Sequence, residues 1–145
     1  MPTITPVCAD DLEDLAVLYE ELTGNKTNLL NMARIFDQIA GNNNYLLIGA
    51  RDRKQRLVGS LMGILCMDIV GECRPFLVLE NVIVSERYRR QGIGRKLIAY
   101  IENWAREHDC YYIMLVSLSR RKQAHDFYAR LDYEPGVVQG YKKYL

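Results

Sequence analysis

The stretch that most constrains the fold of this chain runs from Phe76 to Leu97, where an apolar segment leads into a basic turn and then into a helix. The segment 76–84 is apolar except at Glu80 and Asn81, which is typical of a strand covered on both faces. Beyond the turn, apolar residues recur at helical spacing. They are Leu97, Ile98, Ile101, Trp104 and Ala105. A strand followed at once by a helix predicts a crossover unit of an α/β sheet.

The turn between this strand and helix has the composition of an anion-binding site. Its residues are Arg89, Arg90, Gln91, Gly92, Ile93 and Gly94. The first backbone N–H groups of a helix have no partner within the helix, and the helix dipole favours negative charge there. Glycines without side chains let a phosphate approach the backbone. A basic cluster is commonly only a solvated face, but beside a glycine turn it suits a phosphorylated ligand.

The rest of the chain alternates between strand-like and helix-like patterns. Asp10 with Glu13 predicts a capping box at the start of the first helix, and Gly24 predicts its end. Asn28 predicts the cap of a second helix, which Gly41 ends. In chain order we expect a strand at 3–7, helices from 10 and from 28, strands at 45–50, 57–67 and 76–84, a helix at 94–108, a strand at 111–116, a helix at 123–131, and one or two short strands within 133–145.

This order of elements predicts the α/β fold class. We expect a mixed central β-sheet of six or seven strands, flanked by about four helices. A chain of 145 residues can bury about two-thirds of its unfolded surface, which is enough for one core. We therefore expect a single domain over residues 1–145.

Charge and cysteine content narrow the class of partners. The formal net charge is +1, which argues against nucleic acid or a membrane surface as the partner. The four cysteines form no CxxC pair and have no histidine at metal-ligand spacing, so we expect no metal site and free thiols in a reducing compartment. No apolar run approaches the ~18 residues of a membrane span, and no leader pattern is present. The sequence thus predicts a cytoplasmic protein.

Three motifs together resemble a known family. Arg89, Gly92 and Gly94 match the acetyl-CoA signature of the GNAT superfamily of acyl-CoA-dependent N-acyltransferases, in the expected place between a strand and a helix. The segment 124–128 is similar to the family's Ala-x-x-Phe-Tyr helix, and 79–84 is similar to the strand that small-amine acetyltransferases place beside the thioester. The resemblance covers essentially the whole chain.

The resemblance implies acetyl-CoA as the co-substrate. Backbone N–H groups from Gln91 to Lys96 would bind the pyrophosphate, with nearby arginine and lysine side chains as auxiliary charges. The pantetheine arm would pair with main chain near Val82 to Val84, like an added strand, while the next strand splays away near Ser117. The implied cofactor-binding residues are Val82, Ile83, Val84, Arg89, Arg90, Gln91, Gly92, Ile93, Gly94, Arg95, Lys96 and Ser117.

The chemistry needs a proton acceptor, because an alkylammonium has a pKa near ~10.4 and only the neutral amine attacks. Glu80 is our candidate general base; the alternative is a structural carboxylate. Asn81 lies on the opposite face of the strand by simple alternation, unless the bulge that the resemblance implies alters the parity. A backbone N–H such as that of Ile83 could stabilise the oxyanion. Tyr128 is our candidate proton donor to the leaving thiolate, the alternative being a core tyrosine.

The sequence departs from the family pattern at two places. Arg121 stands where many members carry an asparagine that contacts pantetheine, which puts that contact in doubt. Asp132 and Tyr133 stand where the Phe-Tyr helix commonly ends with Gly-Phe. Since aspartate tolerates the left-handed conformation better than most residues, we expect Asp132 to preserve the cap.

The resulting interpretation is an N-acetyltransferase that moves the acetyl group of acetyl-CoA to a primary amine of a small molecule in a ternary complex. A protein N-terminal or lysine acetyltransferase, and a non-catalytic acyl-CoA-binding sensor, are the alternatives. Loops 22–30, 68–75 and 135–140 would choose the acceptor. Arg74 in the second could receive a phosphate or carboxylate, although a merely exposed arginine is the commoner explanation. The sequence leaves open whether the chain forms a homodimer.

Overall fold

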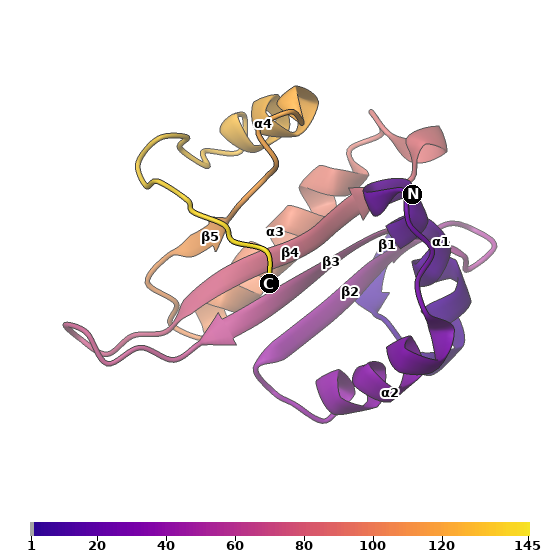
Figure 1. Cartoon of the computed structure of the whole chain (residues 1–145), viewed down its shortest axis with the longest axis horizontal. Coiled ribbons are helices and arrows are strands. Elements are labelled where there is room, and N and C mark those ends of the chain that lie inside the picture. Colours follow the sequence, from indigo (N-terminus) through magenta and orange to yellow (C-terminus); the bar gives the residue numbers. More distant parts are fainter. Residues whose placement is uncertain (1) are drawn as a thin grey trace. The chain divides into compact units, whose positions relative to one another are not determined.

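The computed structural model describes residues 2–145 and divides the chain into two compact units, Met1–Met114 and Leu115–Leu145, each described here by itself (Figure 1). The elements, in chain order, are β1 (Thr3–Pro6), the 3-10 helix η1 (Ala9–Asp11), α1 (Leu12–Thr23), α2 (Leu29–Ala40), β2 (Tyr45–Arg51), β3 (Leu57–Cys66), β4 (Phe76–Val84), the 3-10 helix η2 (Glu86–Tyr88), α3 (Ile93–Glu107), β5 (Ile113–Leu115) and α4 (Lys122–Ala129).

The strands form one sheet in the order β1-β2-β3-β4-β5. The first four strands pair antiparallel with their neighbours. The chain then crosses over through α3 and returns to the edge of β4, where Leu77 N donates to Tyr112 O at 3.0 Å and Tyr111 N donates to Pro75 O at 2.8 Å. The fold class is therefore α/β with a mixed sheet and four α-helices, as expected.

The expectation of six or seven strands is wrong, because the described residues contain five. The missing strands were those predicted within 133–145, a segment that has turns and irregular structure instead. Two residues there oppose strand pairing. Pro135 has no backbone N–H to donate to a ladder, and Gly136 adopts a left-handed conformation with φ +78°, which turns the chain.

Helix ends follow the local sequence in part. Gly24 ends α1 in the left-handed conformation, and Asn28 caps α2 by accepting a 3.0 Å hydrogen bond from Asn31 N. The predicted capping box of the first helix is shifted, because the reciprocal carboxylate is that of Asp11, which accepts from Cys8 N at 2.7 Å. Asp11 also forms a two-bond ion pair with Arg51 of β2, at 2.5 and 2.6 Å. This ion pair with Arg51, a residue distant in the sequence, favours Asp11 as the capping carboxylate.

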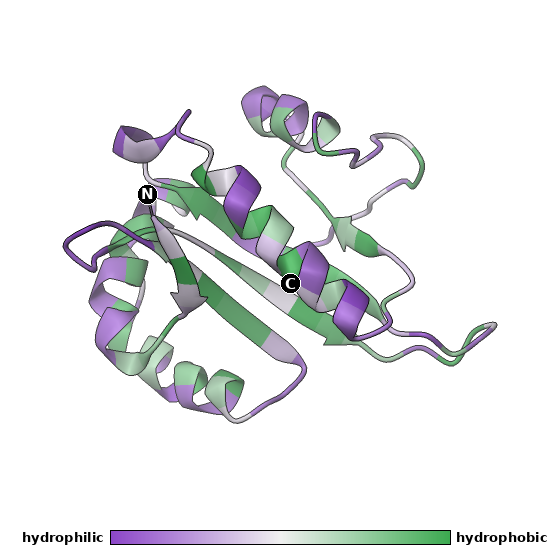
Figure 2. Cartoon of the chain, turned by 180° about the vertical axis from the view of Figure 1, so that it is seen from behind, coloured by the Kyte–Doolittle hydropathy of each residue, from purple (hydrophilic) through white to green (hydrophobic). Residues whose placement is uncertain are grey.

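Helices cover both faces of the sheet (Figures 1 and 2). On one face, Leu15 and Leu18 of α1 join a buried cluster with Ile83 of β4. On the other face, α3 lies close to β3, since a Cβ added at Gly63 would stand 2.7 Å from the Ile101 side chain. Figure 2 shows the hydrophobic side of α3 turned toward the strands. β4 therefore has buried side chains on both of its faces.

Candidate functional site

β4 carries a bulge beside Glu80. The register with β3 pairs Ser60 with Ile83 and Met62 with Glu80, so that three steps along β4 oppose two steps along β3. Such an extra residue is a β-bulge, and it leaves one residue of the strand without a partner in the ladder. Asn81 lies within it and adopts a left-handed conformation with φ +54°. The bulge implied by the family resemblance is present at the expected position.

The bulge decides which way Glu80 points. Residues directly opposite each other in a ladder project from the same face of the sheet, and residues two apart on a regular strand do so as well. Glu80 therefore shares a face with Met62, Ser60 and Ile83, and Ile83 packs against the helix α1. In a regular strand Glu80 and Ile83 would project from opposite faces. The Glu80 carboxyl is partly buried on the α1 face.

The bulge also changes the edge of β4 to which each N–H group points. Ser85 N donates to Val58 O of β3 at 2.8 Å, and N–H groups along a strand point alternately to its two edges. The N–H of Ile83 is thus directed at β3 and is used by the sheet. The N–H groups of Val82 and Val84 point toward the other edge, on which β5 pairs near Leu77. Of the two, only the N–H of Val82 is directed away from β3.

One residue near Glu80 was not singled out from the sequence. Tyr19 of α1, which the pattern placed only in the core, packs against the cluster that contains Ile83. Burial raises the pKa of Tyr19 to about 12, while the polar side chain of Asn81 acts in the opposite direction. No local signal marks this contact, because the two residues lie far apart in the sequence.

The turn before α3 presents free backbone N–H groups. Gly92 is the N-cap of α3 and adopts φ +77°, and no side chain caps the helix. A Cβ added at Gly92 would meet nothing within 4 Å, so the space above the turn is open to a ligand. The first turn of a helix leaves its N–H groups without partners inside the helix. Lys96 N is already bonded to Gly92 O at 3.1 Å, so the backbone donors predicted from Gln91 to Lys96 end at Arg95.

The cationic side chains of the turn differ in their surroundings: one is bonded within the fold, and the others reach the surface to different degrees. Arg89 Nε donates to Val84 O at 3.0 Å and ties the turn to the end of β4. Arg90 adopts a left-handed conformation with φ +62° and its side chain is exposed. Arg95 is also exposed, and Lys96 is partly buried. Ile93 is buried in the core, so that only its backbone can contact a ligand.

The geometry of the turn fits the phosphates of coenzyme A, which carries a pyrophosphate and a 3′-phosphate. Anions are stabilised where free N–H groups and the positive end of a helix dipole converge, and α3 supplies both at residues 92–95. An open cavity of about 510 Å³ adjoins the turn through Gln91, and three cationic side chains of the β2–β3 turn line it. They are Arg53, Lys54 and Arg56, and the Asp52 carboxylate, which pairs with Arg56 at 3.1 Å, also lines the cavity.

The second unit holds the other two predicted site residues. The Tyr128 ring contacts the rings of Phe127 and Tyr133, with centroids 5.2 and 6.0 Å away. Burial raises the pKa of Tyr128, while the positive charge of Arg121 acts against that change. Ser117 Oγ is buried and has no hydrogen-bond partner within the described residues. Such an unmet polar atom suits contact with an amide of a ligand.

The unusual end of α4 keeps the cap that the sequence predicts. Asp132 adopts a left-handed conformation with φ +65°. Tyr133 N donates to Tyr128 O at 3.1 Å and Asp132 N donates to Ala129 O at 3.2 Å. These two hydrogen bonds are those of a Schellman motif, so aspartate replaces the usual glycine without loss of the cap.

The contacts of Arg74 lie within the protein and do not favour the interpretation in which it receives a phosphate or carboxylate. Its guanidinium donates to Asp109 O at 3.2 Å and to Cys110 O at 3.3 Å, and it forms a 3.1 Å ion pair with the Asp109 carboxylate. It also lies 5.7 Å from the centre of the Tyr111 ring. Arg74 therefore fastens the β3–β4 loop to the end of α3, where a cation is favoured by the helix dipole.

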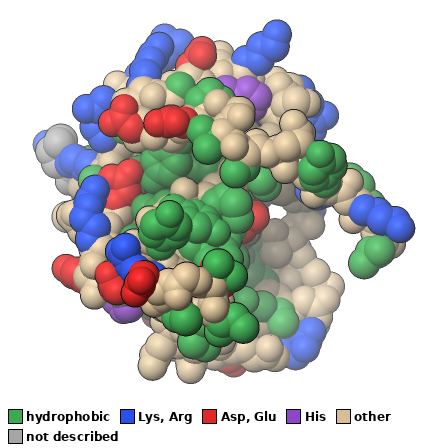
Figure 3. Space-filling view, turned by 90° about the vertical axis from the view of Figure 1, so that its left-hand side faces the viewer, with side chains coloured by type: hydrophobic (Ala, Val, Ile, Leu, Met, Phe, Trp, Pro, Cys, Tyr) green, Lys and Arg blue, Asp and Glu red, His purple; other side chains and the backbone are tan. Residues whose placement is uncertain are grey.

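Exposed apolar side chains mark the same loop. Met67, Ile69 and Val70 project into solvent, with Ile69 91% exposed, and Tyr111 is exposed near the base of the loop. Figure 3 shows hydrophobic side chains gathered on this side of the molecule. The loop is one of those expected to choose the acceptor, and it exposes these apolar side chains beside the charged Glu72 and Arg74.

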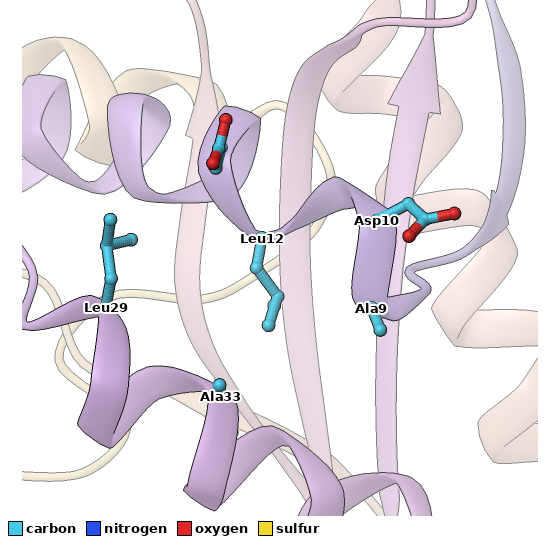
Figure 4. Close-up of a pocket in the computed structure, with 6 residues that line it drawn as sticks. Ala9, Asp10, Leu12, Leu29 and Ala33 are labelled. Carbon is cyan, nitrogen blue, oxygen red and sulfur yellow. The ribbon is translucent and has the colours of Figure 1, made fainter.

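A further open cavity, of about 450 Å³, lies at the starts of α1 and α2 (Figure 4). It is lined by Ala9, Asp10, Leu12, Glu13, Leu29 and Ala33. None of the predicted catalytic or cofactor-binding residues lines it. Within residues 2–145, no group of three or more His, Cys, Asp or Glu side chains is placed to hold a metal ion, and no helix has the length and apolar character needed to cross a membrane.

Comparisons with known proteins agree with the geometry. The sequence profile described as acetyltransferase (GNAT) family matches residues 12–133. A curated relative, aminoglycoside N(6′)-acetyltransferase type 1 from Serratia marcescens, is 40% identical over 45 residues. This match spans 30% of the chain and 31% of the relative.

Solved structures share the fold over their whole length. A transcriptional regulator from Bacillus halodurans C-125 has a TM-score of 0.92 at 23% identity, with 100% of both chains covered. An aminoglycoside antibiotic 6′-N-acetyltransferase from Acinetobacter baumannii has a TM-score of 0.81 at 22% identity, covering 100% of this chain and 99% of that one. At such identities the likeness describes the fold alone.

Proposed function

We propose that this chain, which belongs to the acetyltransferase (GNAT) family, transfers the acetyl group of acetyl-CoA to a primary amine of a small molecule in a ternary complex. The family match spans both compact units, which supports one acetyltransferase domain over residues 1–145. Four free cysteines support a reducing compartment and hence the cytoplasm.

A single observation carries this proposal: one continuous segment, from Glu80 to Arg95, presents a carboxylate, strand N–H groups directed away from β3 and a helix N-terminus in that order. The Glu80 carboxyl lies beside the bulge. The N–H groups of Val82 and Val84 point away from β3 and can pair with the amides of a pantetheine arm, as in strand addition. The turn at Gly92 then meets the phosphates.

Glu80 removes a proton from the attacking amine. Bound acetyl-CoA supplies an acetyl thioester; a bond forms from the amine nitrogen to the acetyl carbon, and the bond from that carbon to sulfur breaks. Since the amine loses one proton in this exchange, a nearby carboxylate or a water molecule bound to it accelerates the reaction. The N–H of Val82 stabilises the charge that develops on the carbonyl oxygen.

Tyr128 assists the departing sulfur without being indispensable. A phenol with a pKa near ~10 protonates a thiolate whose conjugate acid has a pKa near ~8.5 only with an uphill transfer of about 2 kcal/mol. Burial raises the pKa of Tyr128 further, which increases this difference. Tyr128 therefore acts by hydrogen bonding to the sulfur rather than by complete proton transfer.

The acceptor is a small amine, in keeping with the relatives' names. Both the curated relative and one of the structural relatives are aminoglycoside N-acetyltransferases, whose acceptors by name are amines. The apolar loop at Met67, Ile69 and Val70 suits an acceptor with an apolar part in addition to its amine.

The proposal is tested by measuring thiol release from acetyl-CoA in the presence of a panel of primary amines. The panel contains aminoglycosides, simple alkylamines and aromatic amines, and a peptide with a free N-terminus and a lysine. We expect amine-dependent thiol release with at least one small amine and an acetylated product by mass spectrometry. Turnover on the peptide alone would indicate a protein acetyltransferase. Tight CoA binding with no turnover on any amine would indicate a sensor.

A further inference from the structure

The β2–β3 turn, residues 52–56, is organised by the carboxylate of Asp52. Its Oδ1 accepts hydrogen bonds from Lys54 N at 2.8 Å and from Arg56 N at 3.0 Å. Its Oδ2 accepts from the Tyr88 hydroxyl at 3.1 Å and pairs with the Arg56 guanidinium at 3.1 Å. Tyr88 belongs to η2, directly before the turn that leads into α3. Asp52 therefore links the β2–β3 turn to the segment that carries the proposed phosphate site.

Further contacts hold the same turn at its ends. Arg51 Nη1 donates to Gln55 O at 3.2 Å, and the Arg51 guanidinium is itself held by its ion pair with Asp11. Gln55 N donates to Asp52 O at 3.0 Å, and Asp52 N donates to Arg56 O at 3.0 Å. The turn is thus ordered before a ligand binds. A binding group that is already ordered loses less entropy on binding.

Two cationic side chains of this turn are left without a partner. The charge of Arg56 is compensated by Asp52. Arg53 and Lys54 are exposed, and neither side chain has a hydrogen-bond or ion-pair partner among the described residues. Both line the open cavity of about 510 Å³ that reaches Gln91 in the turn before α3. Uncompensated positive charge therefore lies beside the proposed pyrophosphate site.

Coenzyme A carries a second anionic group next to its pyrophosphate. The 3′-phosphate is attached to the ribose and, as a monoester, bears about 1.5 to 2 negative charges at neutral pH. The backbone N–H groups at 92–95 are few and suit the pyrophosphate. A phosphate monoester is bound well by an arginine fork and by a lysine ammonium. The β2–β3 turn presents one of each.

We propose that the β2–β3 turn is a phosphomonoester subsite, in which Arg53 and Lys54 bind the 3′-phosphate of the acetyl donor. The inference rests on the proposed function for the identity of that donor. The subsite selects donors by a group remote from the thioester. A donor with the same pantetheine arm and no 3′-phosphate loses this contact, so the chain discriminates against it in binding.

The first test is calorimetric binding of CoA and of dephospho-CoA, which lacks only the 3′-phosphate. We expect the wild type to bind CoA about fivefold tighter at low salt, since exposed ion pairs are individually weak. In Arg53→Ala/Lys54→Ala the two nucleotides should bind equally, and the affinity for dephospho-CoA should stay within about twofold of wild type. Both side chains are exposed and the backbone contacts of Asp52 remain, so this variant should fold.

The matched control is Arg120→Ala/Lys122→Ala, which removes the same two charges from exposed positions beside the start of α4. It should keep the preference for CoA. A preference that survives in Arg53→Ala/Lys54→Ala would overturn the inference. A preference that falls equally in both double variants would reflect the net charge of the protein and would overturn it too. Loss of the preference in the control alone would assign the 3′-phosphate to the other cations and would also contradict the proposal.

The salt dependence of this preference is a second readout. Exposed charges are screened over a Debye length of about 10 Å at 0.1 M salt. The ratio of the two affinities should therefore fall toward one as salt is added to the wild type, and stay near one in Arg53→Ala/Lys54→Ala. A wild-type ratio that does not change with salt would mean that another kind of contact recognises the group, and the inference would be wrong.

Kinetics with acetyl-CoA and acetyl-dephospho-CoA separate binding from chemistry. We expect the wild type to have a KM about fivefold higher for acetyl-dephospho-CoA with similar kcat, because a contact made equally in the ground state and the transition state changes only binding. Arg53→Ala/Lys54→Ala should show this higher KM with both donors. A difference in kcat with equal KM values would contradict a binding subsite.

These measurements distinguish the inference from the proposed function. A wild-type protein that binds neither nucleotide contradicts the proposed function and removes the donor on which the inference rests. A protein that binds CoA and dephospho-CoA equally contradicts the inference alone. A protein that prefers CoA through Arg53 and Lys54 but acetylates no amine supports the subsite and contradicts the proposed reaction.

Discussion

The bulge in β4 and the turn before α3 solve the same backbone problem by different means. Each contains a left-handed residue other than glycine, Asn81 with φ +54° and Arg90 with φ +62°. The turn is supported by its immediate neighbours in sequence, since Arg89 Nε bonds to Val84 O and Gly92 supplies a second left-handed residue. Beside the bulge, Tyr19 of α1 packs against the cluster that contains Ile83.

The difference separates the two ends of the proposed donor site. The phosphate end depends on contacts within a few residues, so it forms wherever the strand and α3 form. The end that carries Glu80 depends on the packing of α1 against β4. We therefore expect changes at Glu80 and Gly92 to have effects on different measured quantities, and changes in α1 to affect only the Glu80 end.

The largest effect is expected for Glu80→Gln, which keeps the shape and removes the proton acceptor. General base catalysis contributes about 10²- to 10⁴-fold, so we expect kcat/KM for the amine to fall by a factor in that range. The affinity for CoA, measured by calorimetry, should change less than twofold, because the carboxyl lies at the thioester end. Glu107→Gln, at an exposed glutamate at the end of α3, is the control. An equal loss of CoA affinity would mean that the two ends are not separate.

The next effect is expected for Gly92→Val, which acts on the phosphate end. Valine at φ +77° is strained by about 1–2 kcal/mol, and its side chain would occupy the open space above the turn. We expect CoA affinity to fall at least about tenfold, which corresponds to about 1.4 kcal/mol, and more than in Glu80→Gln.

Gly24→Val is the matched control for that variant. Gly24 has φ +78°, and a Cβ there also meets nothing within 4 Å, so the backbone strain is the same. It ends α1 rather than beginning α3. Both variants should lose similar stability in urea unfolding, while only Gly92→Val loses CoA affinity. Equal affinities in the two variants would remove the turn from the binding site.

The parts of the fold that the sequence predicted are those with local causes. The strand at 76–84 has the predicted bounds, because its apolar run ends where the charged turn begins. The caps at Gly24 and Asn28 were confirmed, since each depends on one residue type. The prediction of one or two strands within 133–145 was wrong, and Pro135 and Gly136 in that segment both oppose strand pairing.

The candidate site, too, was predictable only where its causes are local. The glycines of the turn predict its conformation, and the family resemblance implied the bulge near Glu80. Neither pattern pointed to Tyr19, since at helical spacing it cannot be told from the core residues around it. Asp11 was likewise missed as the capping carboxylate, because its selection depends on Arg51 of β2. Contacts between distant segments decide both positions.

The smallest effect is expected from alkaline pH. It acts through Tyr19 of α1, which lies at the Glu80 end of the proposed site and not at the phosphate end. The pKa of Tyr19 is raised to about 12 in the folded protein by burial, against 10 for an ordinary tyrosine. Below pH 10 the phenol is protonated in both the folded and the unfolded state, so its contribution to stability is complete. Between pH 10 and 12 the unfolded state loses the proton first, so stability falls with rising pH, by at most about 1.4 kcal/mol per pH unit for one group.

Tyr19→Phe isolates this contribution, because lysines and other tyrosines titrate in the same range in both proteins. Urea unfolding between pH 9 and 11 should show the free energy of unfolding declining less steeply in Tyr19→Phe than in the wild type. Tyr128→Phe, measured alongside, separates the second tyrosine whose pKa is raised by burial. Parallel profiles of Tyr19→Phe and wild type would mean that burial against β4 does not raise the pKa of Tyr19.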